Sequence, residues 1–223
     1  SVGTETSVPA ITTAWTLEDA SGTLTFNNLT FGESASVATW QSLDNFDVNG
    51  NLSTQQGTLN RSASTINVAG NILNGVNGKW SGVATTTFDG AVARTWTDTA
   101  AEKQNIGHVV VDGSAKTVTI NSSVLAQSIT IGANDTFSGG GSNDIQILGN
   151  FTNTNVFVPS TSRLVVTGAA TNAVITTGGS NLYAVRASST GGSVSFAGSS
   201  VTLLDNLEIA TGTVTMPTTL MRI

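Results

Sequence analysis

Ile66-Asn67-Val68-Ala69-Gly70-Asn71 reappears in altered form as Ile145-Gln146-Ile147-Leu148-Gly149-Asn150. In both stretches two apolar residues flank a polar one, and a Gly-Asn pair follows. Successive side chains of a β-strand point to opposite faces, so the apolar pair faces one side and the polar residue the other. Gly and Asn accept positive φ and let the chain turn directly after the strand. Each stretch therefore predicts a short strand followed by a corner.

The same triplet pattern continues along nearly the whole chain, while helical spacing is not sustained anywhere. The best helical candidate, Asp98 to Gln104, is short and lies between Thr-rich strands, so we interpret it as a loop or a single turn. The other triplets are Val118-Thr119-Ile120, Ile129-Thr130-Ile131, Val194-Ser195-Phe196, Leu207-Glu208-Ile209 and Val214-Thr215-Met216. The sequence therefore predicts an all-β protein.

Repetition separates the possible all-β folds. Four segments realign in order at an offset of roughly 78 residues, which indicates a duplicated unit. Within this unit strands restart about every 10 to 20 residues, which suggests coils of about 20 residues. One coil cannot bury its own apolar face, but stacked coils share a core. We predict a parallel β-helix, or β-solenoid, of about ten or eleven coils and roughly 50 Å in length. A jelly-roll or β-sandwich is the alternative.

Composition narrows the class further. Hydrophobic residues make up 39% and charged residues only 10%, with a net charge of −6 and no cysteine. The absence of cysteine excludes disulfides, thiol catalysis and Cys-ligated zinc. No basic patch exists, so nucleic-acid binding has no electrostatic basis. No apolar run is long enough for a transmembrane helix, so we expect no membrane span. Absent cysteine and few lysines fit a secreted or cell-surface protein.

Several motifs together resemble a known repeat. They are Phe26-Asn27-Asn28-Leu29-Thr30-Phe31, Phe46-Asp47-Val48-Asn49-Gly50-Asn51-Leu52, Gly57-Thr58-Leu59-Asn60 and Thr87-Phe88-Asp89-Gly90. This run is similar to the β-helix repeats of large secreted bacterial and archaeal surface proteins, such as adhesins and surface-layer proteins. The resemblance implies a right-handed parallel β-helix over residues of about 22 to 216. It implies no common active site.

The two ends of the chain differ from the repeat. Residues 1–21 do not fit it, and we expect either a cap over the first coil or an arm that packs on a neighbouring molecule, with the solenoid over residues 22–223. Val214-Thr215-Met216 predicts one more strand, and no polar cap follows it. An open solenoid end invites end-to-end stacking.

Candidate catalytic residues are few. The only histidine, His108, could belong to a Ser–His–Asp triad, but no G-x-S-x-G motif accompanies it, and we interpret it as a surface or packed residue. Paired carboxylates could hydrolyse glycosides if stacking brought them together. The acids are dispersed, and we interpret them as solvated outward residues; they are Glu33, Asp44, Asp47, Asp89, Asp98, Glu102, Asp112, Asp135, Asp144, Asp205 and Glu208. The chain is therefore predicted not to be an enzyme.

Some residues could instead bind ligands. The run from Gly139 to Asp144 is similar to one calcium-binding β-roll nonapeptide, and Asn134-Asp135 could add oxygen ligands. Calcium needs six to eight oxygens and the run has no tandem copy, so we interpret it as a flexible turn and predict no metal or cofactor. Aromatic residues that could stack on sugars, although packing or a protein contact is expected for each, are Trp15, Trp40, Trp80, Trp96 and Tyr183. Sequons at Asn28, Asn51, Asn60, Asn121, Asn134 and Asn150 allow glycosylation.

The sequence thus favours a structural subunit of an extracellular assembly, such as a filament, sheath or surface layer. Its predicted partners are copies of itself. An adhesin or carbohydrate-binding module with surface glycans as partners is the second hypothesis, and a polysaccharide-degrading enzyme is the third.

Overall fold

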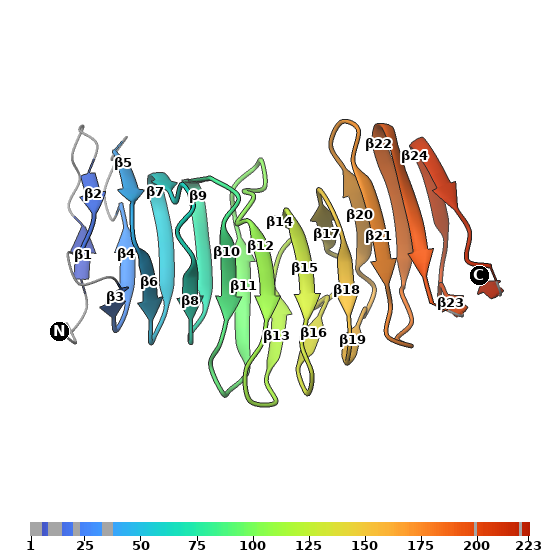
Figure 1. Ribbon diagram of the computed structural model, residues 1–223, viewed down its shortest axis with the longest axis horizontal. Helices are drawn as coiled ribbons and strands as arrows, with labels where there is room; N and C mark the ends of the chain where they lie inside the picture. The colour runs from blue at the N-terminus through green and yellow to red at the C-terminus, as the bar shows by residue number, and fades with distance from the viewer. Residues whose placement is uncertain (1–5, 9–14, 20–22, 33–37, 199, 219) are drawn as a thin grey trace.

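The protein is a rod of stacked parallel strands (Figure 1). The computed structural model describes residues 6–8, 15–19, 23–32, 38–198, 200–218 and 220–223. This part of the chain contains no helix, and every strand pair in it is parallel. The β-solenoid prediction is confirmed, and the jelly-roll or sandwich alternative is wrong. No helix among these residues is long and apolar enough to cross a membrane.

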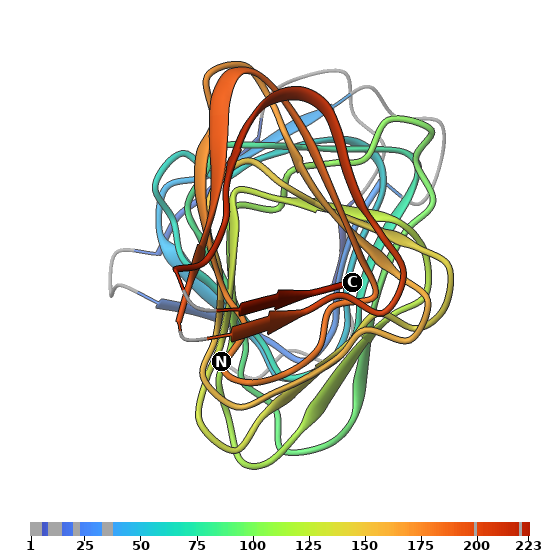
Figure 2. The same cartoon turned by 90° about the vertical axis from the view of Figure 1, so that its right-hand side faces the viewer.

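The solenoid makes about nine turns, and it is right-handed. Seen from the C-terminal end, the chain runs counter-clockwise as it approaches the viewer (Figure 2). The prediction of ten or eleven coils was too high, because many coils are longer than the sequence suggested. Coil length also varies: Thr39 pairs with Thr58 on the next coil, whereas Trp15 pairs with the more distant Trp40. Corners among the described residues also differ in length: three residues separate β8 (Ile66–Val68) from β9 (Ile72–Ser81), whereas five separate β10 (Thr85–Phe88) from β11 (Arg94–Asp98).

Strand pairing groups the strands into three stacks, and a complete coil contributes one strand or half-strand to each stack. The first stack holds β3 (Thr23–Phe26), β6 (Asn45–Val48), β8 (Ile66–Val68), β10 (Thr85–Phe88), β12 (His108–Val111), β15 (Ser128–Ile131), β18 (Phe151–Asn153) and β21 (Asn172–Thr176). The second stack holds β1 (Thr6–Val8), β4 (Leu29–Phe31), the first halves of β7 (Leu52–Asn60) and β9 (Ile72–Ser81), β11 (Arg94–Asp98), β13 (Thr117–Ile120), β16 (Thr136–Ser138) and β19 (Val156–Val158).

The third stack closes each coil. It holds β2 (Trp15–Leu17), β5 (Thr39–Ser42), the second halves of β7 and β9, β14 (Val124–Ala126), β17 (Asp144–Ile147), β20 (Arg163–Thr167) and the first halves of β22 (Ala184–Ala197) and β24 (Leu207–Thr215). The second halves of β22 and β24 return to the first stack. Near the C-terminal end, β23 (Ser200–Thr202) pairs with β25 (Leu220–Arg222).

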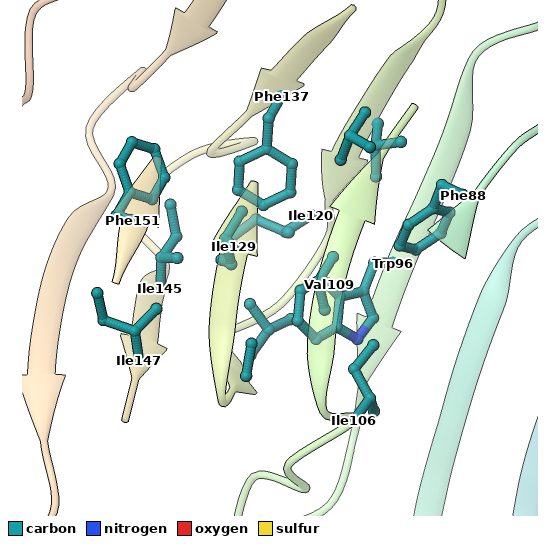
Figure 3. Packing of buried hydrophobic residues seen from close by; sticks show 14 of the residues in the cluster. Phe88, Trp96, Ile106, Val109, Ile120, Ile129, Phe137, Ile145, Ile147 and Phe151 are labelled. Carbon is teal, nitrogen blue, oxygen red and sulfur yellow. The ribbon is translucent and has the colours of Figure 1, made fainter. Parts of the chain in front are cut away.

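Alternation along the strands builds the core. In the triplets of β8 and β17 the outer residues are buried and the middle residue is partly exposed, as predicted. Inward Val, Ile, Leu and Phe side chains from all three stacks meet on the axis, and Trp96 packs against Phe88 at 6.4 Å between ring centroids (Figure 3). The core is therefore continuous from coil to coil.

The strand pairing bears on two parts of the predicted domain division, the N-terminal segment and the duplicated unit. β1 pairs with β4 and β2 with β5, so these parts of residues 1–21 add strands to the stacks. The rest of that segment lies largely outside the described residues, and the cap and the arm stay predictions. The long duplicated unit also stays a prediction. Ile66 in β8 and Ile145 in β17, which align in sequence, lie in different stacks.

Candidate functional site

A groove of about 550 Å³ lies at the corner where β7 and β9 bend from the second stack to the third. Val76 is exposed at its rim. An open depression beside the groove shares Gln56, Val76 and Asn77 with it. Among the described residues, the wall combines amide and charged side chains with small residues and one valine, and no aromatic residue takes part. The groove is lined by Gln56, Gly57, Thr58, Val76, Asn77, Gly78, Lys79, Ala100, Ala101, Glu102 and Gln104.

Asp98 holds the loop that forms one wall of this groove. Its buried carboxylate accepts hydrogen bonds from the backbone N–H of Ala100 (3.0 Å) and Gln104 (2.7 Å), and from the side-chain amide of Asn74 (3.0 Å). These bonds hold residues 99–104, which follow β11, as an irregular loop, and the interpretation of this stretch as a loop is confirmed. Asp98 is thus a structural residue rather than a solvated outward one, because a buried carboxylate needs such partners.

A separate hollow, here called the Tyr183 pocket, lies at the corner that leads into β17, β20, β22 and β24. It has a volume of about 260 Å³. Four successive coils each contribute one short segment to the pocket, and these segments lie above one another at the same corner. Its lining residues are Ser142, Asn143, Asp144, Thr161, Arg163, Tyr183, Ala184, Asp205 and Asn206. Sequence reasoning named Tyr183, Asp144 and Asp205 separately and missed that they meet.

An ion-pair network runs beside the Tyr183 pocket. Arg163 donates to both carboxylate oxygens of Asp144, from Nε at 3.1 Å and from Nη2 at 3.0 Å, and its Nη1 lies 3.4 Å from Glu208. Arg186 reaches Glu208 at 3.3 Å. The hydrogen bonds that Arg163 donates to Asp144 raise the pKa of Arg163 further above its usual value. Asp144 is therefore committed to an ion pair.

Three of the four tryptophans lie in the core, away from any surface on which a sugar could stack. Trp40, Trp80 and Trp96 are buried in the core, so the expectation of packing is confirmed for these three. The side chain of Trp15 lies outside the described residues. Tyr183, in contrast, is partly exposed at a hollow.

His108 is exposed on the first stack, as a surface residue was expected to be. Its Nδ1 lies 2.8 Å from the hydroxyl oxygen of Ser128 on the next coil. Within the described ranges no carboxylate hydrogen-bonds to its ring. The pair lacks the third group that would orient the imidazole in a Ser–His–Asp triad.

The candidate calcium ligands are engaged elsewhere. Asp135 is buried and accepts hydrogen bonds from the backbone N–H of Gly113 (3.0 Å) and Lys116 (3.1 Å), and Asp144 pairs with Arg163. No group of three His, Cys, Asp or Glu residues gathers in the part of the chain that the structure describes. Gly139 is buried against the next coil, where an added Cβ would overlap the hydroxyl of Ser162. The first glycine of the run, Gly139, therefore allows neighbouring coils to pack closely.

Several acids and a lysine interact electrostatically near the corner after the first stack. Burial raises the pKa of Asp89, and the negative charge of Asp47 raises it further. Burial lowers the pKa of Lys116, against the opposing effect of Asp135, Asp89 and Asp112. A raised carboxyl pKa is a property of general acids, but neither Asp47 nor Asp89 lines any of the hollows described above. Another candidate acid, Glu33, lies outside the described residues. The prediction that the chain is not an enzyme stays a prediction.

Four of the sequon asparagines use their side-chain oxygens in the scaffold. Asn28 accepts from the backbone N–H of Asn51, Asn51 from that of Asn71, Asn60 from that of Ser62, and Asn150 from that of Val174. Three of these bonds tie neighbouring coils together, and the one from Asn60 is local to its corner. Glycosylation at the six sequons stays a prediction.

Arg61 is a cation inside the core. It is fully buried, lies over the ring of Trp80 at 5.2 Å, and donates to the hydroxyl of Thr86 (2.6 Å) and the carbonyl of Gly82 (3.2 Å). Burial lowers the pKa of Arg61 to about 10. No sequence pattern distinguished this arginine from the solvated ones.

The lowered pKa of Arg61 predicts a pH dependence. Its folded pKa lies below the unfolded one, so burial of the charge costs stability at low pH, and this cost is relieved as the pH rises through the folded pKa of about 10 toward the higher pKa of the unfolded chain. Relative to Arg61→Met, we expect the natural chain to gain about 1 kcal/mol in free energy of unfolding between pH 9 and pH 11. Urea unfolding of both proteins at the two pH values measures this, and all other titrating groups cancel in the difference. If the difference in free energy of unfolding between the two proteins were the same at both pH values, the lowered pKa of the buried Arg61 guanidinium would be contradicted.

Comparison of the chain with protein-family models, with curated proteins and with solved structures finds no match. The fold therefore defines the class by itself: the protein is a right-handed parallel β-solenoid. The resemblance to surface-protein repeats stays a prediction.

Proposed function

We propose that this protein is a structural subunit of an extracellular, cell-surface assembly that forms by packing of one solenoid end against another copy. The observation that carries the proposal is the C-terminal end of the stack. β24 pairs with β22 on one side, and within the described part of the chain no strand covers its other side. Its free N–H and C=O groups form a pairing edge.

Side chains at this end point inward like core side chains, but no further coil buries them among the described residues. Ile209 continues the inward column of Val166 and Ala187. Ala187 is 1% exposed, whereas Ile209 is 55% exposed. Met216, Leu220 and Ile223 are exposed nearby. Such a concentration of apolar surface beside a free strand edge favours association.

The occupant that fits best is a second copy of the chain. A coil stacked on β24 must present parallel strands at the same spacing and an apolar interior of the same outline, and a solenoid of this sequence supplies both. A contact between the two different ends of the rod does not close on itself, so it builds a filament. In a longer protein the same face would accept further coils of its own polypeptide.

The extracellular part of the proposal is supported by composition. The chain has no cysteine, few charges and many Ser, Thr and Asn residues on its outward positions. Apolar residues face the core along the whole rod, and an elongated shape of this kind suits a structural scaffold.

Substitution at the open end tests the assembly. We expect the purified chain to form oligomers that grow with concentration, and Ile209→Asp to remain monomeric because it places a charge on the contact surface. Val92→Asp is the matched control, since Val92 is 52% exposed on a loop far from the end. Light scattering after size-exclusion chromatography measures mass, and negative-stain electron microscopy shows whether the oligomers are linear. A natural chain that is monomeric at all concentrations, or Ile209→Asp oligomers like those of the natural chain, would refute the proposal.

A further inference from the structure

The Tyr183 pocket exists because one position in an outward column is small. Asp144, Arg163 and Ala184 lie in register on β17, β20 and β22. The backbone N–H of Val185 donates to the carbonyl of Asn206, which places Asn206 beside Ala184 on the last coil. Since Ala184 ends at Cβ, a hollow opens between Arg163 and Asn206.

We infer that this pocket binds a neutral glycan. The inference goes beyond the proposed assembly and does not rest on it. A sugar ring presents hydroxyl groups that both donate and accept hydrogen bonds, and an apolar face of C–H groups. The pocket offers Asn143 and Asn206 as amides and Asp205 as an acceptor. Tyr183 adds an aromatic ring with a polar tip.

The charges around the pocket favour a neutral ligand over a polyanion. Two arginines, Arg163 and Arg186, face three acids, Asp144, Asp205 and Glu208. The arginines are engaged in ion pairs with Asp144 and Glu208. Among the described residues no arginine or lysine pairs with Asp205, whose carboxylate contacts the amide of Asn206 at 3.1 Å. A polyanion would meet a carboxylate that no cation neutralises.

The same contacts favour binding over cleavage. Glycoside hydrolysis needs two carboxyl groups that are free to act as acid and as base or nucleophile. Asp144 is held by two hydrogen bonds from Arg163, which leaves Asp205 as the one acid of the described lining without a cationic partner. The volume of about 260 Å³ is below that of usual small-molecule pockets, so it admits one unit of a longer chain.

The pocket lies at the corner before the third stack and reaches the last coil through Asp205 and Asn206, whereas the open end is formed by β24, β25 and the side chains around Ile209. Glycan binding and end-to-end packing use different residues, so they are tested separately.

Titration with defined oligosaccharides tests the inference. The probes are cellohexaose, chitohexaose and mannohexaose, with a polygalacturonate oligomer of similar length as the anionic comparison, and the readout is calorimetry or NMR shift mapping on the full chain. We expect at least one neutral hexasaccharide to bind saturably and the polygalacturonate to bind more weakly. Tyr183→Ala should weaken binding at least tenfold, while Tyr183→Phe, which keeps the ring, should stay within about threefold.

Two further variants keep the result decisive. Asn206→Ala removes an exposed amide from the pocket and should weaken binding severalfold, even if Tyr183→Ala were poorly folded by circular dichroism. His108→Ala lies on another stack and should leave binding unchanged. Absence of saturable binding to every neutral probe, a preference for polygalacturonate, or binding that is indifferent to both pocket substitutions would overturn the inference.

Discussion

Gly107→Ala should destabilise the solenoid by about 3 kcal/mol or more, from backbone strain and overpacking together. Gly107 has φ +86°, which disfavours residues with a Cβ, and an added Cβ would overlap the carbonyl oxygen of Ala84 and the guanidinium of Arg61. The Ala84 carbonyl cannot retreat freely, because it accepts a hydrogen bond from the backbone N–H of His108 at 3.1 Å. Urea unfolding followed by circular dichroism gives the free energy of unfolding.

Gly179→Ala is the matched control for this prediction. Gly179 has φ +85°, nearly that of Gly107, but no atom lies within 4 Å of its added Cβ. We expect it to cost only the conformational strain, about 1–2 kcal/mol. The difference between the two losses in free energy of unfolding gives the contribution of the close contact between stacked coils at Gly107. Equal losses would show that coil packing does not require a glycine at position 107.

Trp96→Ala should cost about 3–5 kcal/mol. Trp96 is 0% exposed and packs against Phe88 between neighbouring strands of the core, so its removal leaves a large cavity in the middle of the rod (Figure 3). A solenoid coil contacts only its two neighbours, so no distant element can move in to fill that space. The same unfolding experiment measures the loss.

Two comparisons sharpen the tryptophan prediction. Trp96→Phe keeps most of the volume and removes an indole N–H that is buried without a hydrogen-bond partner among the described residues, so we expect it to lose much less than Trp96→Ala. Val92→Ala changes a nearby exposed side chain in the loop before β11 and should stay within about 0.5 kcal/mol. If Trp96→Ala were as mild as Val92→Ala, the core would not be packed as described.

Much of the fold was predictable from short stretches of sequence. The triplets of β8, β13, β15 and β17 show alternating burial as expected, because the direction of a side chain in a strand depends on local backbone geometry alone. The Gly-Asn corners after β8 and β17 and the regular restart of strands led to the prediction of the stacked arrangement. The count of coils was wrong because corner loops vary in length.

The candidate sites were much less predictable. The sequence shows Asp144, Arg163, Tyr183 and Asp205 as scattered residues, and the pocket that joins them depends on the register of four coils. A column of residues spaced at the coil length would have indicated the contact, but coils of unequal length blur that spacing. The burial of Asp98 and Arg61 had no sequence signal at all.

The sequence by itself determined that this chain is built from short strands, which side of each strand is apolar, and that the coils stack in parallel. The strands and their apolar sides follow from a period of two and from turn residues, which act over a few neighbouring positions. The parallel stacking was predicted from the repetition of strands along the chain. Only the tertiary structure decided which residues lie above one another, which charges enter the core, and which apolar residues are left uncovered at the end. These depend on the summed lengths of all the corners between two strands, and those lengths differ from coil to coil, so no fixed spacing along the sequence gives them.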